Sequence, residues 1–152
     1  MFRGLTAVNL DGKGRMAMPS RYRTALEGEA KGVLVVTIDT EQNCLLLYPY
    51  HQWELIETKL EALSSFNPVT RRIQRLLIGH ATELEMDGQG RILLPALLRE
   101  YAGLDRALML VGQGKKFEIW GETQWQKGRE TWLAEELGGE EGMPDELRHL
   151  SL

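Results

Sequence analysis

The chain has 152 residues, of which 43% are hydrophobic and 26% charged, a composition typical of a globular protein with one domain or two small ones. A single cysteine excludes an intrachain disulfide and a cysteine-cluster metal site. The first residues lack the charged-then-apolar pattern of a signal peptide, and no apolar run approaches the roughly 20 residues that span a bilayer, so we expect a cytoplasmic protein without a membrane partner.

The net charge of −4 is divided unevenly along the chain. Residues 1–76 carry 10 Lys and Arg against 8 Asp and Glu, whereas residues 77–152 carry 8 against 14. The first 23 residues are the most basic part, with five cations and one acid. This asymmetry indicates a basic working surface attached to an acidic remainder, although a solvated surface with uneven charge would give the same pattern.

One nine-residue pattern occurs twice, as DGKGRMAMP at 11–19 and DGQGRILLP at 87–95. The segments 45–53 and 117–125 also align with each other. At a constant offset of 76 positions, the residues that match are Asp11, Gly12, Gly14, Arg15, Pro19 and Arg23 with Asp87, Gly88, Gly90, Arg91, Pro95 and Arg99. The sequence therefore predicts two copies of one unit.

The first copy is expected to contain two strands joined by a tight Asp-Gly turn, a short helix opened by a proline, and a hairpin of two strands, over residues 5–10, 16–18, 19–28, 33–38 and 44–48. Within the helix, Tyr22, Ala25 and Leu26 recur at helical spacing and should face the core. Gly28 supplies the expected stop.

The second copy repeats this order over residues 83–86, 92–94, 95–103, 107–112 and 116–120. Its helix should bury Leu98, Tyr101 and Ala102 and stop at Gly103. A unit of about 75 residues with strands this short buries little surface alone. We therefore expect the two copies to share one sheet, related by an internal two-fold.

Two longer helices should follow the first copy. The earlier one carries an apolar stripe made of Trp53, Ile56, Leu60 and Leu63. The later one begins with Asn67 as N-cap and Pro68 as its first residue. Its inward face should hold Val69, Ile73, Leu76 and Leu77, and its opposite face Arg71, Arg72 and Arg75. This basic face is either a solvated surface or a binding site. The acidic, Gly-rich stretch 138–152 is expected to be a flexible tail.

Enzymatic motifs do not fit the sequence. Residues 12–17 match G-x-G-x-x-A, but a dinucleotide-binding turn leads directly into a helix, whereas this one leads into a strand. A phosphate-binding loop needs four residues between its glycines and a Ser or Thr after Lys, and residues 12–15, Gly-Lys-Gly-Arg, meet neither requirement. The three histidines lack metal-ligand spacing, and Cys44 lies between apolar strand segments as a small buried residue. We predict no catalytic, cofactor-binding or metal-ligating residue and no small-molecule substrate.

The cations of the first turn are the remaining candidates for function. In an extended segment Lys13 and Arg15 would project to one face, because side chains alternate along a strand. Beside glycines that permit close approach, two such cations can contact DNA phosphates and form a forked pair with guanine.

The alternative is that each arginine braces its turn by pairing with an aspartate, Asp11 with Arg15 and Asp87 with Arg91. We favour DNA contact for the first turn. For the second turn we favour the brace, because Gln89 stands where the first turn has a lysine and the nearby residues are acidic.

The pattern D-x-x-G-R-x-x-x-P-x-x-x-R, present in both copies, is similar to the swapped-hairpin domain of the AbrB superfamily. Two copies in one chain, together with FRG at the start, CLLLYP and NPVTRRIQRLLIGHA, resemble the MraZ family over nearly the whole chain, to about residue 135. The resemblance implies an α+β fold, mainly β, of tandem AbrB-like swapped-hairpin barrel repeats with flanking helices. It places the repeats at 1–76 and 77–137.

The resemblance also implies a function. A member of this family would be a transcriptional repressor that binds double-stranded DNA at repeated boxes in the promoter of the division and cell-wall gene cluster. It would be associated with the nucleoid and would assemble into homo-oligomeric rings.

A ring would reconcile the acidic net charge with DNA binding. If every subunit presents Arg3, Lys13 and Arg15 on one rim, weak contacts add up to a multivalent surface. The alternative is a non-catalytic, ring-forming scaffold that binds protein partners through its acidic half. Salt dependence separates the two, since phosphate contacts weaken steeply as salt rises.

Overall fold

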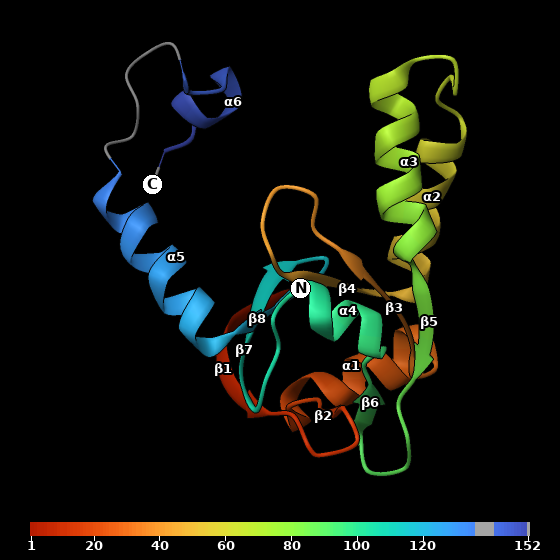
Figure 1. Cartoon of the computed structure of the whole chain (residues 1–152), viewed down its shortest axis with the longest axis vertical. Helices are drawn as coiled ribbons and strands as arrows, with labels where there is room; N and C mark the ends of the chain where they lie inside the picture. The colour runs from red at the N-terminus through yellow and green to blue at the C-terminus, as the bar shows by residue number, and fades with distance from the viewer. Residues whose placement is uncertain (136–141, 152) are drawn as a thin grey trace. The chain divides into compact units, whose positions relative to one another are not determined.

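The computed structural model describes residues 1–135 and 142–151 (Figure 1). The chain forms two compact units, Met1–Glu122, here called the core unit, and Thr123–Leu152, the C-terminal unit. The elements are, in order, β1 (Phe2–Asn9), β2 (Arg15–Ala17), α1 (Ser20–Ala30), β3 (Val33–Ile38), β4 (Leu45–Pro49), α2 (Tyr50–Glu61), α3 (Pro68–His80), β5 (Thr82–Glu85), β6 (Arg91–Leu93), α4 (Ala96–Tyr101), β7 (Ala107–Gly114), β8 (Phe117–Gly121), α5 (Glu122–Ala134) and α6 (Asp145–Arg148).

The two copies share one sheet, as expected. Its six strands run in the order β1-β7-β8-β4-β3-β5, and β2 and β6 pair in a second, two-stranded sheet. The strands β1, β2, β3 and β4 of the first copy correspond to β5, β6, β7 and β8 of the second. When each strand of the six-stranded sheet is replaced by its counterpart, the same order results, read from the opposite edge. This arrangement confirms the mixed α+β class and gives the core unit an internal two-fold relation.

The hairpins expected within each copy are present. Val36 pairs with Leu47 between β3 and β4, and Leu110 pairs with Ile119 between β7 and β8. The strands on either side of the Asp-Gly turn, in contrast, meet only at an isolated bridge between Leu10 and Met16. β1 instead pairs with β7 along its whole length, and β2 pairs with β6. Strands before and after the turn therefore find their partners in the other copy.

The main core lies between the large sheet and the β2–β6 pair. Alternate residues of the strands fill it, because successive side chains of a strand point to opposite faces. Its members include Met16, Leu34, Leu45, Leu110 and Phe117, all fully or almost fully buried. A smaller cluster of Val35, Leu46, Tyr48 and Trp53 covers the other face of β3 and β4, beneath α2 and α3.

Three details of the short helices differ from the sequence prediction. Ala25, expected to face the core from the first short helix, is exposed. α1 does not stop at Gly28 but continues to Ala30, and its cap is Lys31, with a φ of 52°. A single glycine costs a helix only about 1 kcal/mol, and Ala30, two residues beyond Gly28, is buried. In α4, Tyr101 is exposed and its hydroxyl donates to the Asp39 carbonyl at 2.6 Å.

α3 begins as predicted, since the Asn67 side chain accepts from the Val69 and Thr70 amides and Pro68 is the first helical residue. The side chains on its inward face are less buried than expected. Val69 is 68% exposed, and no residue of α3 is fully buried. Thr37 of β3 anchors the helix by donating to the Leu77 carbonyl at 2.7 Å. Leu63 lies beyond the end of α2 and is exposed, so the stripe of that helix ends earlier than predicted.

The expected flexible tail at 138–152 falls partly outside the described residues. Within it, residues 142–151 contain the short helix α6. Nowhere in the described ranges does a helix combine the length and the apolar character needed to cross a membrane.

Candidate nucleic-acid interface

The two Asp-Gly turns have the same internal geometry. In the first, the Asp11 amide donates to the Arg15 carbonyl at 2.9 Å, and the Gly14 amide donates to the Asp11 carbonyl at 3.0 Å. In the second, the corresponding bonds from Asp87 and Gly90 are both 2.9 Å. The two turns share this shape although the sequences around the motif differ.

The aspartate of each turn organises the following residues. Asp11 Oδ1 accepts from the amides of Lys13 and Arg15, each at 2.9 Å, and Oδ2 accepts from Arg15 Nε at 2.7 Å. Asp87 repeats this set with Gln89 and Arg91, the Nε–Oδ2 distance being 2.8 Å. The aspartate–arginine pair thus forms in both turns. What distinguishes the first turn is Lys13.

These hydrogen bonds stabilise the ionised carboxylates. The amide and the guanidinium of Arg15, with the Lys13 amide, lower the pKa of Asp11 to about 2. The Arg91 amide, together with the Gln89 amide and the Arg91 side chain, likewise lowers the pKa of Asp87. Both aspartates are therefore ionised at neutral pH, and each keeps its pairing with the arginine of its turn.

The aspartate–arginine pair of the first turn leaves the terminal nitrogens of the arginine available to a ligand. Arg15 bonds Asp11 through Nε, and its two terminal nitrogens donate to no other described residue. The guanidinium is thereby fixed in orientation while its terminal fork remains open to a ligand. In each turn the aspartate cancels one positive charge. Asp11, Lys13 and Arg15 together therefore carry a net charge of +1, whereas Asp87, Gln89 and Arg91 are neutral in sum.

The second arginine of the motif lies against the other copy's turn. Arg99 Nε donates to the Leu94 carbonyl at 3.0 Å, and a Cβ at Gly14 would lie 2.6 Å from its guanidinium carbon. Gly14 has a φ of 86°, in the region that favours glycine. The glycine therefore serves both the turn and the close approach of Arg99.

The reciprocal contact involves Arg23 and Gly90. Arg23 Nε donates to the Met18 carbonyl at 2.7 Å, and a Cβ at Gly90, whose φ is 73°, would collide with Arg23. Backbone bonds of 2.9 Å accompany both contacts, from the Leu94 amide to the Gly14 carbonyl and from the Met18 amide to the Gly90 carbonyl. The sequence showed these arginines as motif positions but not this role, because the role depends on the exchange of strands between copies.

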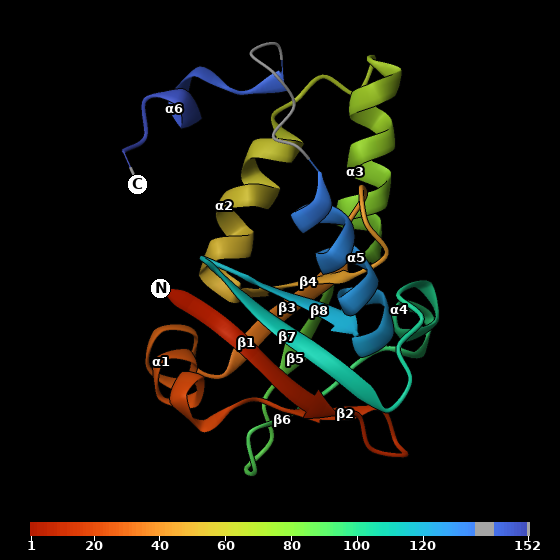
Figure 2. The ribbon, with the colours of Figure 1, turned by 90° about the vertical axis from the view of Figure 1, so that its left-hand side faces the viewer.

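Both turns lie at the same end of the core unit, opposite the end that carries α2 and α3 (Figures 1 and 2). The alternation argument for Lys13 and Arg15 is wrong in its premise, because Lys13 lies in the turn and the strand begins only at Arg15. Arg3 is near the start of β1, six residues before Asn9, which places it about 20 Å along the strand from the turn. The structure therefore does not bring Arg3 beside Lys13 and Arg15.

The cations near Arg15 in the sequence are also engaged elsewhere. Arg21 donates to Thr6 Oγ1 and lies over the Tyr22 ring, 4.7 Å from its centroid. Beside the first turn, a groove of about 700 Å³ is lined by Asn9, Leu10, Asp11, Gly12, Arg99, Leu104, Asp105 and Arg106. The two cations among these residues, Arg99 and Arg106, come from the acidic half of the sequence.

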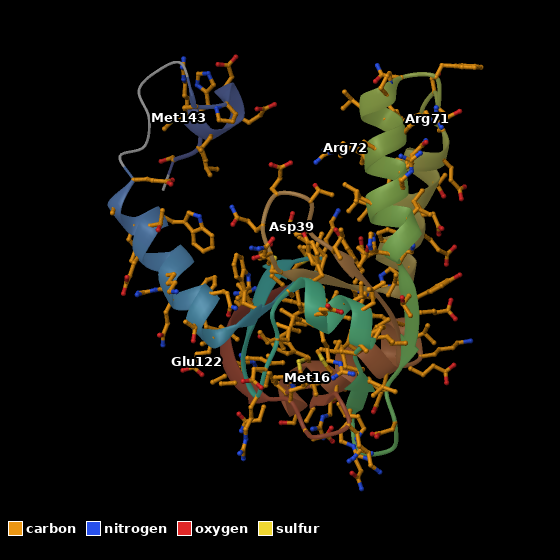
Figure 3. The ribbon with its side chains drawn as sticks, viewed as in Figure 1. Met16, Asp39, Arg71, Arg72, Glu122 and Met143 are labelled. Atoms are coloured by element: carbon orange, nitrogen blue, oxygen red, sulfur yellow. The ribbon has the colours of Figure 1, made fainter. Side chains whose placement is uncertain are left out.

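The basic face of α3 is a separate feature. Arg71, Arg72 and Arg75 are exposed, and Arg71 and Arg72 lie toward the far end of the α2–α3 pair, away from the core around Met16 (Figure 3). None of the three forms a salt bridge with a described residue.

Asp39, Cys44 and Glu118 bring three donor atoms within 4.8 Å of one another. Cys44 is buried, with its sulfur 3.6 Å from Asp39 Oδ2, and Glu118 accepts from Trp120 Nε1 at 2.9 Å. Burial, with the nearby carboxylates, raises the pKa of the Cys44 thiol. Cys44 is the packed small residue that the sequence predicted.

Comparison with known proteins gives the family. The family model described as "MraZ protein, putative antitoxin-like" matches residues 1–76 and 77–138. A protein from Coxiella burnetii named "Transcriptional regulator MraZ" is 64% identical over 152 residues, the full length of both chains. Proteins of the same name from Legionella pneumophila and Alkalilimnicola ehrlichii are 55% and 54% identical, also over the full length of both chains. These relatives are named as regulators and not as enzymes, in keeping with the expectation of a non-catalytic protein. With this match and the two interleaved motif repeats, the chain belongs to the MraZ family.

Proposed function

We propose that this protein is a sequence-specific, double-stranded-DNA-binding transcriptional regulator. The observation that carries the proposal is its full-length similarity to proteins named as transcriptional regulators. The geometry of the first turn supports it, because a braced arginine with an open fork and an adjacent exposed lysine suits a guanine edge flanked by phosphates.

The proposed contacts are divided between the turns. Arg15 reads a base, Lys13 contacts phosphate, and Arg3 contributes from further along β1 to a wider basic surface. Asp11 braces the first turn. Asp87 and Arg91 brace the second turn without reading DNA, because that turn lacks a lysine and is neutral in sum. The repeats extend over 1–76 and 77–137, followed by the acidic tail.

We further propose that the protein acts as a repressor at repeated boxes in the promoter of the division and cell-wall gene cluster, in the bacterial cytoplasm at the nucleoid. A homo-oligomeric ring would repeat the first turn around its rim. Repeated contacts of this kind raise affinity by about 10²- to 10⁴-fold without a new type of interaction, which offsets the acidic net charge.

The test is DNA binding by full-length protein to the region upstream of its own gene. Arg15→Ala should weaken binding by roughly 5- to 150-fold per base contact, and Lys13→Gln should reduce the salt dependence by about 0.9 in log–log slope per phosphate lost. Arg91→Ala is the matched control and should keep its affinity while losing thermal stability.

Two results would contradict the proposal. A correctly assembled Arg15→Ala protein with unchanged affinity would remove the base contact. Binding that stays constant as salt rises would favour the protein-binding scaffold instead. If Arg91→Ala lost affinity as severely as Arg15→Ala while keeping its stability and oligomer mass, the division between the turns would be wrong.

A further inference from the structure

Each turn carries an arginine from the other repeat over its buried glycine. Arg99, at the end of the second motif, covers Gly14, and Arg23, at the end of the first, covers Gly90. The glycines are buried and the arginines half-buried. The crossed arrangement means that the shape of each turn depends on the repeat to which it does not belong.

Hydrogen bonds hold the Arg99 contact on both sides. Its Nε bonds the Leu94 carbonyl, and the amide of the same Leu94 bonds the Gly14 carbonyl. Gly14 in turn bonds Asp11, whose carboxylate orients Arg15. A continuous set of hydrogen bonds and contacts therefore runs from Arg99 to the guanidinium that is proposed to read DNA.

We propose that Arg99 is a positioning residue for the DNA contact of the first turn, and that Arg23 holds the shape of the turn at Asp87 in the equivalent way. This inference rests on the proposed function, and it explains why the chain keeps the full motif twice although one turn is proposed to read DNA. The second motif is needed because it supplies the arginine that holds the first turn.

The contact depends on shape as well as on charge. The planar guanidinium lies against a residue without a side chain while its Nε bonds a carbonyl, and a lysine ammonium can do neither in the same way. Arg99→Lys therefore keeps the positive charge and removes the positioning. Arg23→Lys is the matched control, since it makes the equivalent change at the other turn.

The first measurement needs no DNA. Amide hydrogen exchange of the full-length oligomer should accelerate in the peptide around residues 11–15 for Arg99→Lys, and in the peptide around residues 87–91 for Arg23→Lys. If each variant affects its own repeat's turn, or neither turn, the positioning role is overturned whatever the DNA result.

The second measurement uses the upstream DNA and a double-mutant cycle. Arg99→Lys should lower affinity by roughly 5- to 150-fold, and this loss should largely disappear when Arg15 is already Ala, because both changes remove the same contact. Arg23→Lys should lower thermal stability to a similar extent yet leave affinity within about 2-fold. This separates a positioning role from general destabilisation.

Additive losses from Arg99→Lys and Arg15→Ala would overturn the inference, because they would mark Arg99 as an independent contact. Equal affinity losses in Arg99→Lys and Arg23→Lys would also overturn it. If each variant speeds hydrogen exchange in the other repeat's turn but Arg15→Ala binds DNA like the wild type, Arg99 holds the shape of the first turn, and the proposed DNA contact of that turn fails.

Discussion

At the scale of single residues, the motif Asp-x-x-Gly-Arg divides its tasks among three residues. The aspartate accepts two amides and one guanidinium, the glycine provides a positive φ without a Cβ, and the arginine is held by one nitrogen only. Each task restricts the position to one residue type. This explains why the two copies agree at these positions and differ at Lys13 and Gln89.

The lowered pKa of Asp11 makes the first turn sensitive to acid. Its carboxylate is more stable in the folded protein than in the unfolded chain, so its contribution is complete above the ordinary pKa near 4 and disappears as pH falls through about 2. Asp11→Asn should therefore be less stable than wild type at pH 7, and the two proteins should converge between pH 4 and pH 2. Denaturant unfolding across this range tests the expectation.

Asp87→Asn should behave in the same direction, because the equivalent bonds lower the pKa of Asp87 as well. Unfolding curves for wild type and Asp11→Asn that stay parallel down to pH 2 would show that the Asp11 carboxylate does not brace the folded turn.

At the scale of elements, the sequence predicted types and order better than ends. Periodic apolar residues identified the strands, and the Asn67 cap identified the start of α3. The end of α1 was misplaced, because Gly28 lies inside the helix and the left-handed cap is at Lys31, followed by Gly32 with a φ of 75°. Tyr101 and Val69 were assigned to the core by spacing alone, although they lie on the exposed edge of their helices.

The misplaced helix end leads to a stability prediction. Gly28 is exposed inside α1, its φ is not positive, and a Cβ there would meet nothing within 4 Å. Gly28→Ala should therefore stabilise the protein by about 0.5–1 kcal/mol, the difference between glycine and alanine in a helix interior.

Thermal or denaturant unfolding measures this effect, and Gly12→Ala serves as a comparison, since it also meets nothing within 4 Å but lies in a turn. A loss of stability in Gly28→Ala would mean that α1 is interrupted at that position in solution.

At the scale of the whole molecule, the candidate site could be predicted only in part. The turn residues and their aspartate–arginine pairs are local, so the motif revealed them. The cations that complete each turn are not local, because strand exchange brings Arg99 and Arg106 from the acidic half to the first turn. Charge counted along the sequence therefore does not describe the surroundings of the first turn, where Asp105 also comes from the acidic half.

The same exchange predicts how the repeats depend on each other. In the six-stranded sheet β1 pairs only with β7, and in the two-stranded sheet β2 pairs only with β6, so a fragment of residues 1–76 lacks the partner of both strands. The internal two-fold supplies a substitute, because β3 is the equivalent of β7. Fragment 1–76 should therefore either remain unfolded or fold as a homodimer in which β1 of one copy pairs with β3 of the other. Circular dichroism and light scattering of the fragment distinguish these states, and adding a fragment of residues 77–135 should convert either one into a one-to-one complex that buries the native core. A folded, monomeric fragment 1–76 would contradict this expectation, since β1 and β2 would then have found partners within their own repeat.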